Sequence, residues 1–183
     1  MRLYVYVDNS NVWIEGTRLS AVRQGMATDI RDAMARNVTD HSWSYDFGKL
    51  YQAVSSSASA SIGRASLFGS RPPRNDSLWE LARRKGFEVQ VFDRNVANKE
   101  KEVDVAIATQ IMADSYERMQ SGDKVVLVAG DRDYLPVIES LRTRRLGILV
   151  AFWDHATARE LKTPAADFFA FDGLFDFLTL SVV

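Results

Sequence analysis

Short apolar runs along this chain alternate with longer segments in which apolar residues are spaced as in helices. Each run is either continuous or alternates with a period of two residues, which is typical of strands in a buried parallel sheet. A sixth and shorter run, over residues 168–171, predicts an additional strand at the edge of that sheet. The other predicted strands cover residues 3–7, 64–69, 87–92, 125–129 and 148–153.

Helical spacing and capping signals fill the segments between these runs. Along residues 102–119, Val103, Ile107 and Ile111 recur every four residues, which gives the segment one apolar side. Asp46 suits the N-cap of a short helix, and Pro136 suits the first turn of another. The remaining helices are expected over residues 12–34 with a break near Gly25, 46–54, 76–86, 133–145 and 156–162.

Strands that alternate with helices predict an α/β fold, namely a Rossmann-like, doubly wound and mainly parallel sheet. With the strands numbered along the chain, the expected order is 3-2-1-4-5, and the sixth run would extend one edge. Residues 55–61 are rich in serine and alanine and are interpreted as a connection within one domain. The 183 residues are therefore expected to form a single domain, residues 1–183.

Acidic residues follow the first and fourth predicted strands. Asp8 ends the first strand, whereas Asp131 and Asp133 follow the fourth strand and Gly130. The order 3-2-1-4-5 brings these two strands together, so Asp8 and Asp131 are expected to meet at the topological switch point of the sheet. Asp104, at the start of the mid-chain helix, would approach the same place. Carboxylates this close repel one another unless a cation lies between them, and Mg²⁺ or Mn²⁺ prefer such oxygen ligands.

Each of these acids also has an ordinary structural interpretation. Asp8 suits the N-cap of the next helix, and an acid at Asp104 would be stabilised by the helix dipole. Capping needs only one acid, so the pair Asp131 and Asp133 indicates a function more strongly. Asn11 is a candidate to hold a metal ion, a water molecule or a phosphate through its amide group.

Composition excludes several other classes of site. The chain has no cysteine, which excludes disulfides, thiolate zinc sites and cysteine nucleophiles. Its two histidines, His41 and His155, are far apart and do not make a zinc site, although His155 is expected near the acids. The chain also lacks the Walker A, G-x-G-x-x-G and G-x-S-x-G motifs. A strand that follows Met1 and Arg2 at once, with no long apolar run, predicts a cytoplasmic protein without a signal peptide or membrane span.

The net charge of −1 does not by itself indicate a nucleic-acid binder. If the acids converge on one site, however, the rest of the surface is net basic. Aromatic residues near strand ends, Trp13, Phe92 and Trp153, are candidates to stack on bases, with core packing as the commoner alternative. The side chains that lie after strands two and three and are candidates to grip a phosphate backbone are Arg71, Arg94, Lys99 and Lys101.

Three segments carry a family resemblance: V-D-N-S-N at residues 7–11, K-E-V-D at residues 101–104, and A-G-D-R-D-Y-L-P-V-I at residues 129–138. In this order they resemble the NYN domain, a branch of the PIN-like nuclease superfamily that is related to flap endonucleases. The segment of residues 161–168 is similar to the closing motif of the family. The resemblance therefore covers most of the chain.

The resemblance implies a Rossmann-like sheet, an acidic cluster that binds Mg²⁺ or Mn²⁺, and hydrolysis of RNA phosphodiester bonds. Asn11 and Lys101 match the asparagine and the lysine of the family and are expected to bind substrate. Gln110 stands where many relatives carry a further acid, which can weaken a second metal site. The residues that match the catalytic acids are Asp8, Asp104, Asp131 and Asp133, of which the first three are the expected metal ligands.

The leading hypothesis is thus a metal-dependent endoribonuclease whose partner is single-stranded or structured RNA, with no membrane. The enlarged segment of residues 16–61 is a candidate for shaping substrate access or for a contact within a homo-oligomer. The second hypothesis is a catalytically weak RNA-binding or assembly module on the same fold. The third is a metal-dependent phosphatase or an adhesion-type α/β domain, because residues 8–11 resemble the start of an Asp-x-Ser-x-Ser metal motif without its last serine.

Overall fold

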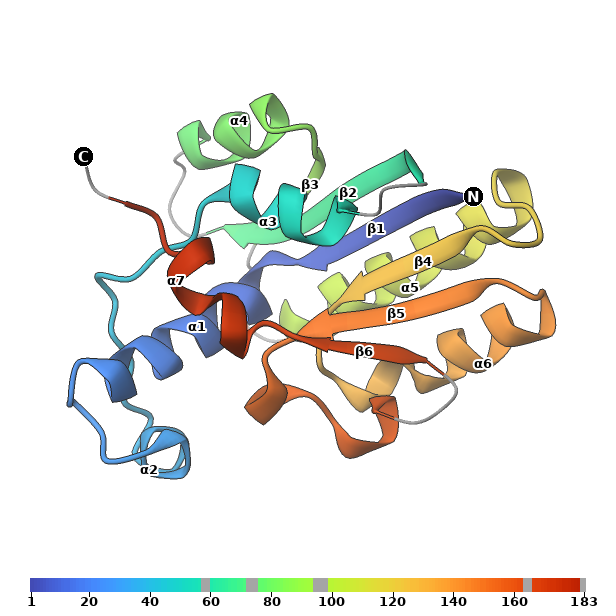
Figure 1. The fold of residues 1–183 in the computed structure, drawn as a ribbon. Coiled ribbons are helices and arrows are strands. Elements are labelled where there is room, and N and C mark those ends of the chain that lie inside the picture. Colours follow the sequence, from blue (N-terminus) through green and yellow to red (C-terminus); the bar gives the residue numbers. More distant parts are fainter. Residues whose placement is uncertain (57–59, 72–75, 94–98, 163–165, 182–183) are drawn as a thin grey trace.

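The structure is a computed structural model, which describes residues 1–56, 60–71, 76–93, 99–162 and 166–181. For Arg71, Asp93 and residues 99–101 it describes the backbone only. Figure 1 shows one sheet with helices packed on both of its faces. The strands are β1 (Arg2–Asp8), β2 (Ser61–Arg71), β3 (Glu88–Asp93), β4 (Lys124–Val128), β5 (Gly147–Phe152) and β6 (Asp167–Ala170).

All neighbouring strands pair in parallel, in the order β3-β2-β1-β4-β5-β6. The predicted order and fold class are confirmed, and β6 is the expected additional strand, beside β5. The strand β1 at the centre is buried on both faces because its side chains alternate between two cores. Val5 and Val7 belong to one core, whereas Tyr4 and Tyr6 belong to the other.

The helices α5 and α6 cover the face of Tyr4 and Tyr6, whereas α3, α4 and α7 lie on the other face (Figure 1). The α-helices are α1 (Asn9–Arg23), α2 (Ile30–Ala35), α3 (Phe47–Ser55), α4 (Ser77–Arg84), α5 (Lys99–Glu117), α6 (Leu135–Thr143) and α7 (Phe175–Leu178). The single-turn 3₁₀ helices are η1 (Arg132–Tyr134), η2 (Asp154–Ala156), η3 (Arg159–Leu161) and η4 (Asp172–Leu174). Within the described residues, no helix is both long and apolar enough to cross a membrane.

Several helix boundaries differ from those predicted. The expected break in residues 12–34 is present, because Gly25 has a φ of +72° that ends the helical path, and Asp29 then caps α2. The helix expected over residues 156–162 consists instead of the two 3₁₀ turns η2 and η3. The helix α5 begins at Lys99, so Asp104 lies in its second turn rather than at its start. The helix dipole therefore stabilises the Asp104 carboxylate less than expected, since the effect of the dipole is confined to the first turn.

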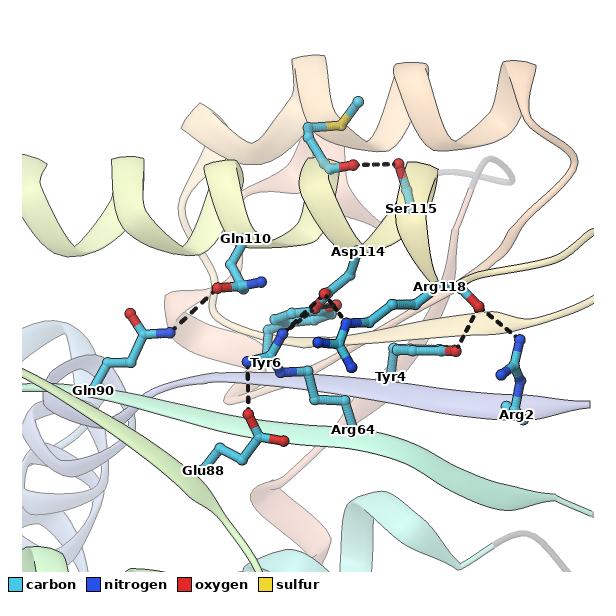
Figure 2. Close-up of polar contacts among 11 residues, drawn as sticks. Arg2, Tyr4, Tyr6, Arg64, Glu88, Gln90, Gln110, Asp114, Ser115 and Arg118 are labelled. Atoms are coloured by element: carbon cyan, nitrogen blue, oxygen red, sulfur yellow. Dashed lines mark hydrogen bonds and ion pairs between the residues drawn. The ribbon is translucent and has the colours of Figure 1, made fainter.

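A buried polar network joins α5 to the strands below it (Figure 2). The Asp114 carboxylate, which is 1% exposed, accepts a hydrogen bond of 2.8 Å from the Tyr6 hydroxyl and one of 2.9 Å from Arg64. Arg118 forms an ion pair of 3.1 Å with the same carboxylate, and Arg64 also bonds Glu88 on β3. Three donors around one buried carboxylate satisfy its charge, so this acid holds α5 onto β1 and β2.

Candidate active site at the carboxyl ends of the central strands

Asp8 stands at the end of β1 and is the N-cap of α1. Its Oδ1 accepts a hydrogen bond of 3.1 Å from the backbone amide of Asn11, which is the capping bond expected from the sequence. Its Oδ2 accepts a second bond of 2.9 Å from the Asn11 side chain. These two bonds hold the Asp8 carboxylate in one orientation, so Asn11 positions the acid.

The Asp8 carboxylate is buried, with only 4% of its surface exposed. Burial raises the pKa of Asp8 to about 6, and the nearby Asp104 carboxylate adds to the increase, while the bonds from Asn11 oppose it. A buried acid whose pKa is raised by a second acid marks a place where a cation would relieve an electrostatic cost. Such perturbed groups are found disproportionately at functional sites.

The Tyr134 hydroxyl connects the other predicted acids to this place. It donates a hydrogen bond of 2.9 Å to Oδ1 of Asp104. Burial raises the pKa of Tyr134 far above its ordinary value, and the carboxylates of Asp104, Asp8 and Asp131 raise it further. Tyr134 is therefore a protonated donor within the electrostatic range of all three acids.

Asp131 and Asp133 follow β4 through Gly130, as the sequence indicated. Asp131 caps η1, since its Oδ1 accepts a bond of 2.9 Å from the backbone amide of Asp133. Both side chains are exposed, unlike that of Asp8. A surface hollow of about 290 Å³ is lined by Asp104, Asp133 and Tyr134, so these side chains share access to solvent.

A second hollow, of about 100 Å³, is lined by Asp131 together with Asn11 and Glu15. Sequence reasoning did not identify Glu15. The signal was its spacing, because Asp8, Asn11 and Glu15 follow one another at steps of three and four residues and so share one side of α1. Burial opposes the ionisation of Glu15, but bonds from His155 and Arg18 outweigh it and lower its pKa.

His155 contacts Glu15, which lines the same hollow as Asp131, and no contact of His155 with the predicted acids is seen among the described residues. Its Nε2 lies 3.2 Å from Glu15, and its Nδ1 lies 3.9 Å from Asp172. Burial alone would lower the pKa of His155, but these two carboxylates outweigh burial and raise it. His41 is exposed and stacks on Trp13, away from this cluster.

Several candidates for substrate binding lie outside the described residues. Arg94 is one of them, and the side chains of Arg71, Lys99 and Lys101 are three more. Asn11 is described and contacts Asp8. The interpretation of Trp153 as a base-stacking residue is wrong: its ring is fully buried, and its Nε1 donates to the Val12 carbonyl at 3.0 Å. Phe92 is partly buried and packs against the core on the α5 side.

The described residues contain no group of three or more acidic or histidine side chains that lie close enough to hold a metal ion as they stand. Asp8 and Asp104 nevertheless interact electrostatically, and both, with Asp131, act on Tyr134. The candidate site thus combines acids of different exposure on three elements: the buried Asp8 at the end of β1, the half-buried Asp104 on α5 and the exposed Asp131 in the turn after β4.

Gly130 is required for the close approach of two segments at this site. A Cβ atom at this position would lie 2.2 Å from the backbone oxygen of Ala156 and 2.7 Å from the Phe152 ring. The same segment is tied to the end of β4 by a hydrogen bond of 2.8 Å from the Ala158 amide to the Gly130 carbonyl. Because glycine has no side chain, the turn before Asp131 can pack against the segment of Phe152 and Ala156.

Gly130→Ala is accordingly expected to lower the free energy of unfolding by about 1–3 kcal/mol, because backbone must move to admit the methyl group. The measurement is urea denaturation followed by circular dichroism. Gly173→Ala is the matched control, since nothing lies within 4 Å of a Cβ atom there. Equal stability of the two variants would show that the packing around Gly130 is looser than described.

Comparison with known proteins agrees with this architecture. The family model of the NYN domain matches residues 2–172. A crystal structure of a protein of unknown function from Vibrio parahaemolyticus superimposes with a TM-score of 0.68 at 18% identity, covering 98% of this chain and 96% of that one. At this identity the likeness shows the fold alone. No curated protein matches the chain significantly.

Proposed function

The chain belongs to the NYN domain family, and from this premise we propose that it is a metal-dependent endoribonuclease that hydrolyses RNA phosphodiester bonds. The observation that carries the proposal is that Asp8 and Asp131 follow two neighbouring parallel strands, with Asp104 bonded at 2.9 Å to Tyr134, three residues after Asp131. These acids come from the ends of β1 and β4 and from α5, at the switch point where ligands bind in open α/β sheets.

We assign Asp8, Asp104 and Asp131 as the ligands of Mg²⁺ or Mn²⁺, directly or through water, with Asp133 at the edge. The donor set suits these ions because it consists of carboxylate oxygens. The raised pKa of Asp8, near 6, is consistent with the assignment, because burial and the nearby Asp104 carboxylate both disfavour the charged form that a cation would stabilise. A bound divalent ion supplies a water molecule of lowered pKa and positive charge beside the scissile phosphate.

The residues of the chain supply the remaining functions. Asn11 holds the Asp8 carboxylate, and Tyr134 holds that of Asp104, so that neither acid has to reorient when substrate binds. Asp133 is exposed at the rim of the hollow that Asp104 lines, and we assign it as the acceptor of a proton from the attacking water. The candidates for binding the RNA backbone are Arg71, Arg94, Lys99 and Lys101.

A second function is favoured by one observation. Gln110 stands where a further acid would be, and its side chain accepts a hydrogen bond of 3.4 Å from Gln90 on β3 (Figure 2). A site with fewer acids fits a catalytically weak module that binds RNA or assembles with other proteins. This alternative predicts RNA binding without metal-dependent cleavage.

The test is cleavage of a labelled single-stranded RNA with Mn²⁺, Mg²⁺ or EDTA, by the wild type and by Asp131→Asn. The expected result is metal-dependent cleavage that falls by at least about a hundredfold in the variant. Asparagine keeps an oxygen for the capping bond to η1, so the fold is expected to survive.

Asp176→Asn is the matched control, because this acid is exposed on α7 and pairs only with Arg23 among the described residues. Its cleavage rate should equal that of the wild type. Cleavage that persists in Asp131→Asn, or that is not reduced by EDTA, would reject the proposed site. Binding of RNA with no cleavage under any condition would favour the binding module.

A further inference from the structure

A larger and mostly apolar hollow, of about 500 Å³, opens at the start of α1, which follows Asp8 in the chain. It lies between the start of α1, the end of β2, and helices α3 and α4. Its volume is within the range of pockets that bind small organic groups, and its lining has the usual character of such pockets, apolar with a few polar atoms. The lining residues that matter here are Asn9, Ser10, Trp13, Tyr45, Ser70 and Trp79.

The aromatic walls of this hollow are held in place before any ligand arrives. Trp79 is 5% exposed and packs on Gly69, where a Cβ atom would lie 2.3 Å from its ring. Trp13 donates a hydrogen bond of 3.2 Å from Nε1 to the Trp43 carbonyl, and its ring stacks on His41. Rigid aromatic walls bind a flat ring at little cost in conformational entropy.

Polar atoms at one side of the hollow are oriented as well. The Tyr45 hydroxyl donates a bond of 2.6 Å to Oδ1 of Asn9, which fixes the rotation of that amide and leaves its NH₂ group on the other side. The hydroxyls of Ser10 and Ser70 lie 3.3 Å apart. Oriented amide and hydroxyl groups beside aromatic rings are what the edge of a nucleobase requires.

The hollow is linked to the acidic site through the chain at the start of α1. Asn9 and Ser10 line the hollow and directly follow Asp8 in the chain. A single peptide bond therefore joins Asn9 to a predicted metal ligand. Tyr45 gives independent support: burial raises its pKa, and the charge of Asp8 raises it further, so the two side chains are within electrostatic range. A group held by Asn9 or Ser10 therefore contacts residues that lie one or two positions along the chain from Asp8.

We propose that this hollow binds one unpaired base of the RNA strand, adjacent to the phosphate that is cleaved. The proposal rests on the proposed function and deepens it, because it names the substrate class as single-stranded RNA. A base in a duplex is paired and stacked and does not enter such a hollow, whereas an unpaired base is free to insert between aromatic side chains.

The first test is binding of a labelled oligoadenylate of about eight nucleotides, a length typical of single-strand sites, in EDTA so that no cleavage occurs. Trp13→Ala should weaken the Kd on the order of tenfold, because one stacked base is lost, whereas Trp13→Phe should retain most of the affinity. Inorganic polyphosphate, which has the backbone charge but no bases, should bind the wild type and Trp13→Ala equally. If Trp13 had a purely structural role, Trp13→Ala would weaken the binding of both ligands alike.

The second test keeps the proposal falsifiable if Trp13→Ala is unstable. RNA that contains 4-thiouridine is cross-linked to the wild type by light, and the modified peptides are identified by mass spectrometry. Cross-links at Trp13, Tyr45 or Trp79 support the proposal. Cross-links confined to other residues, no affinity of the wild type for RNA, or equal Kd values for all three proteins would overturn it.

The two proposals fail in distinguishable ways. Metal-dependent cleavage with a Kd that is insensitive to Trp13→Ala would reject the base-binding hollow and leave the ribonuclease. Cross-links in the hollow without any cleavage would reject the ribonuclease and leave the binding of an unpaired base.

Discussion

Replacement of Asp8 by asparagine is expected to lower the rate of RNA cleavage by at least about a hundredfold while the protein stays folded. Asparagine has nearly the same shape and can still accept the capping bond of 3.1 Å from the Asn11 amide. It lacks the negative charge, so it cannot act as an anionic ligand. The measurement is cleavage of labelled single-stranded RNA in Mn²⁺, with circular dichroism to show that the fold is intact.

The same substitution is expected to stabilise the protein, and the sign follows from the pKa of Asp8. In the unfolded chain this acid titrates near 3.8, whereas in the folded protein it titrates at about 6. Between these values the folded state binds more protons, so the free energy of unfolding falls as pH rises from about 4 to about 6 and stays lower above. The free energy of unfolding is expected to fall by up to about 3 kcal/mol, because the pKa of Asp8 differs by about two between the folded and unfolded states.

Asp8→Asn removes this contribution, because its amide does not titrate. Its free energy of unfolding should therefore exceed that of the wild type at neutral pH, and the difference should vanish near pH 4. Urea denaturation across this pH range, in EDTA, is the measurement. A variant that is less stable than the wild type at neutral pH would contradict the raised pKa of Asp8, even if cleavage were lost.

Replacement of Asp114 by alanine is expected to cost about 3–5 kcal/mol of stability, the range for breaking a buried ion pair by removing one partner. The carboxylate is 1% exposed and the Arg64 side chain 13% exposed, so water cannot readily replace the lost contacts. Alanine leaves the Tyr6 hydroxyl and the Arg64 guanidinium without this acceptor in the core between α5 and the sheet (Figure 2). Thermal and urea denaturation measure the loss.

Tyr6→Phe is the matched control within the same network. It removes one hydrogen bond, of 2.8 Å, and leaves the pair of Asp114 with Arg64, so it should cost only about 1 kcal/mol. Cleavage by Asp114→Ala at a temperature where it is folded should match that of the wild type, because this acid has its own partners. A loss of cleavage in the folded variant would place Asp114 in the active site instead.

The sequence by itself determined the order of the strands and the positions of Asp8 at the end of β1 and of Asp131 after β4, but not the position of Asp104 within α5. A central parallel strand is buried on both faces, so it is apolar throughout, and the runs before Asp8 and Asp131 carry this signature. Local capping rules likewise predicted the bonds that Asp8 and Asp46 make, since each partner lies within three residues. These features depend on interactions between residues that are close in the sequence, so they can be predicted from the sequence pattern.

Only the tertiary structure decided which polar residues meet across the chain. Asp114 is bonded by Tyr6, which lies 108 positions away, and Glu15 meets His155 across 140 positions. Neither pair is indicated by a periodic pattern in the sequence. An acid within a helical segment is predicted to face solvent unless its neighbours in the fold are known. The hollow beside Asp8 also depends on packing, because Trp79 takes its place only where Gly69 lacks a side chain. Such contacts are set by which surfaces of the folded chain come together, and so the sequence pattern could not supply them.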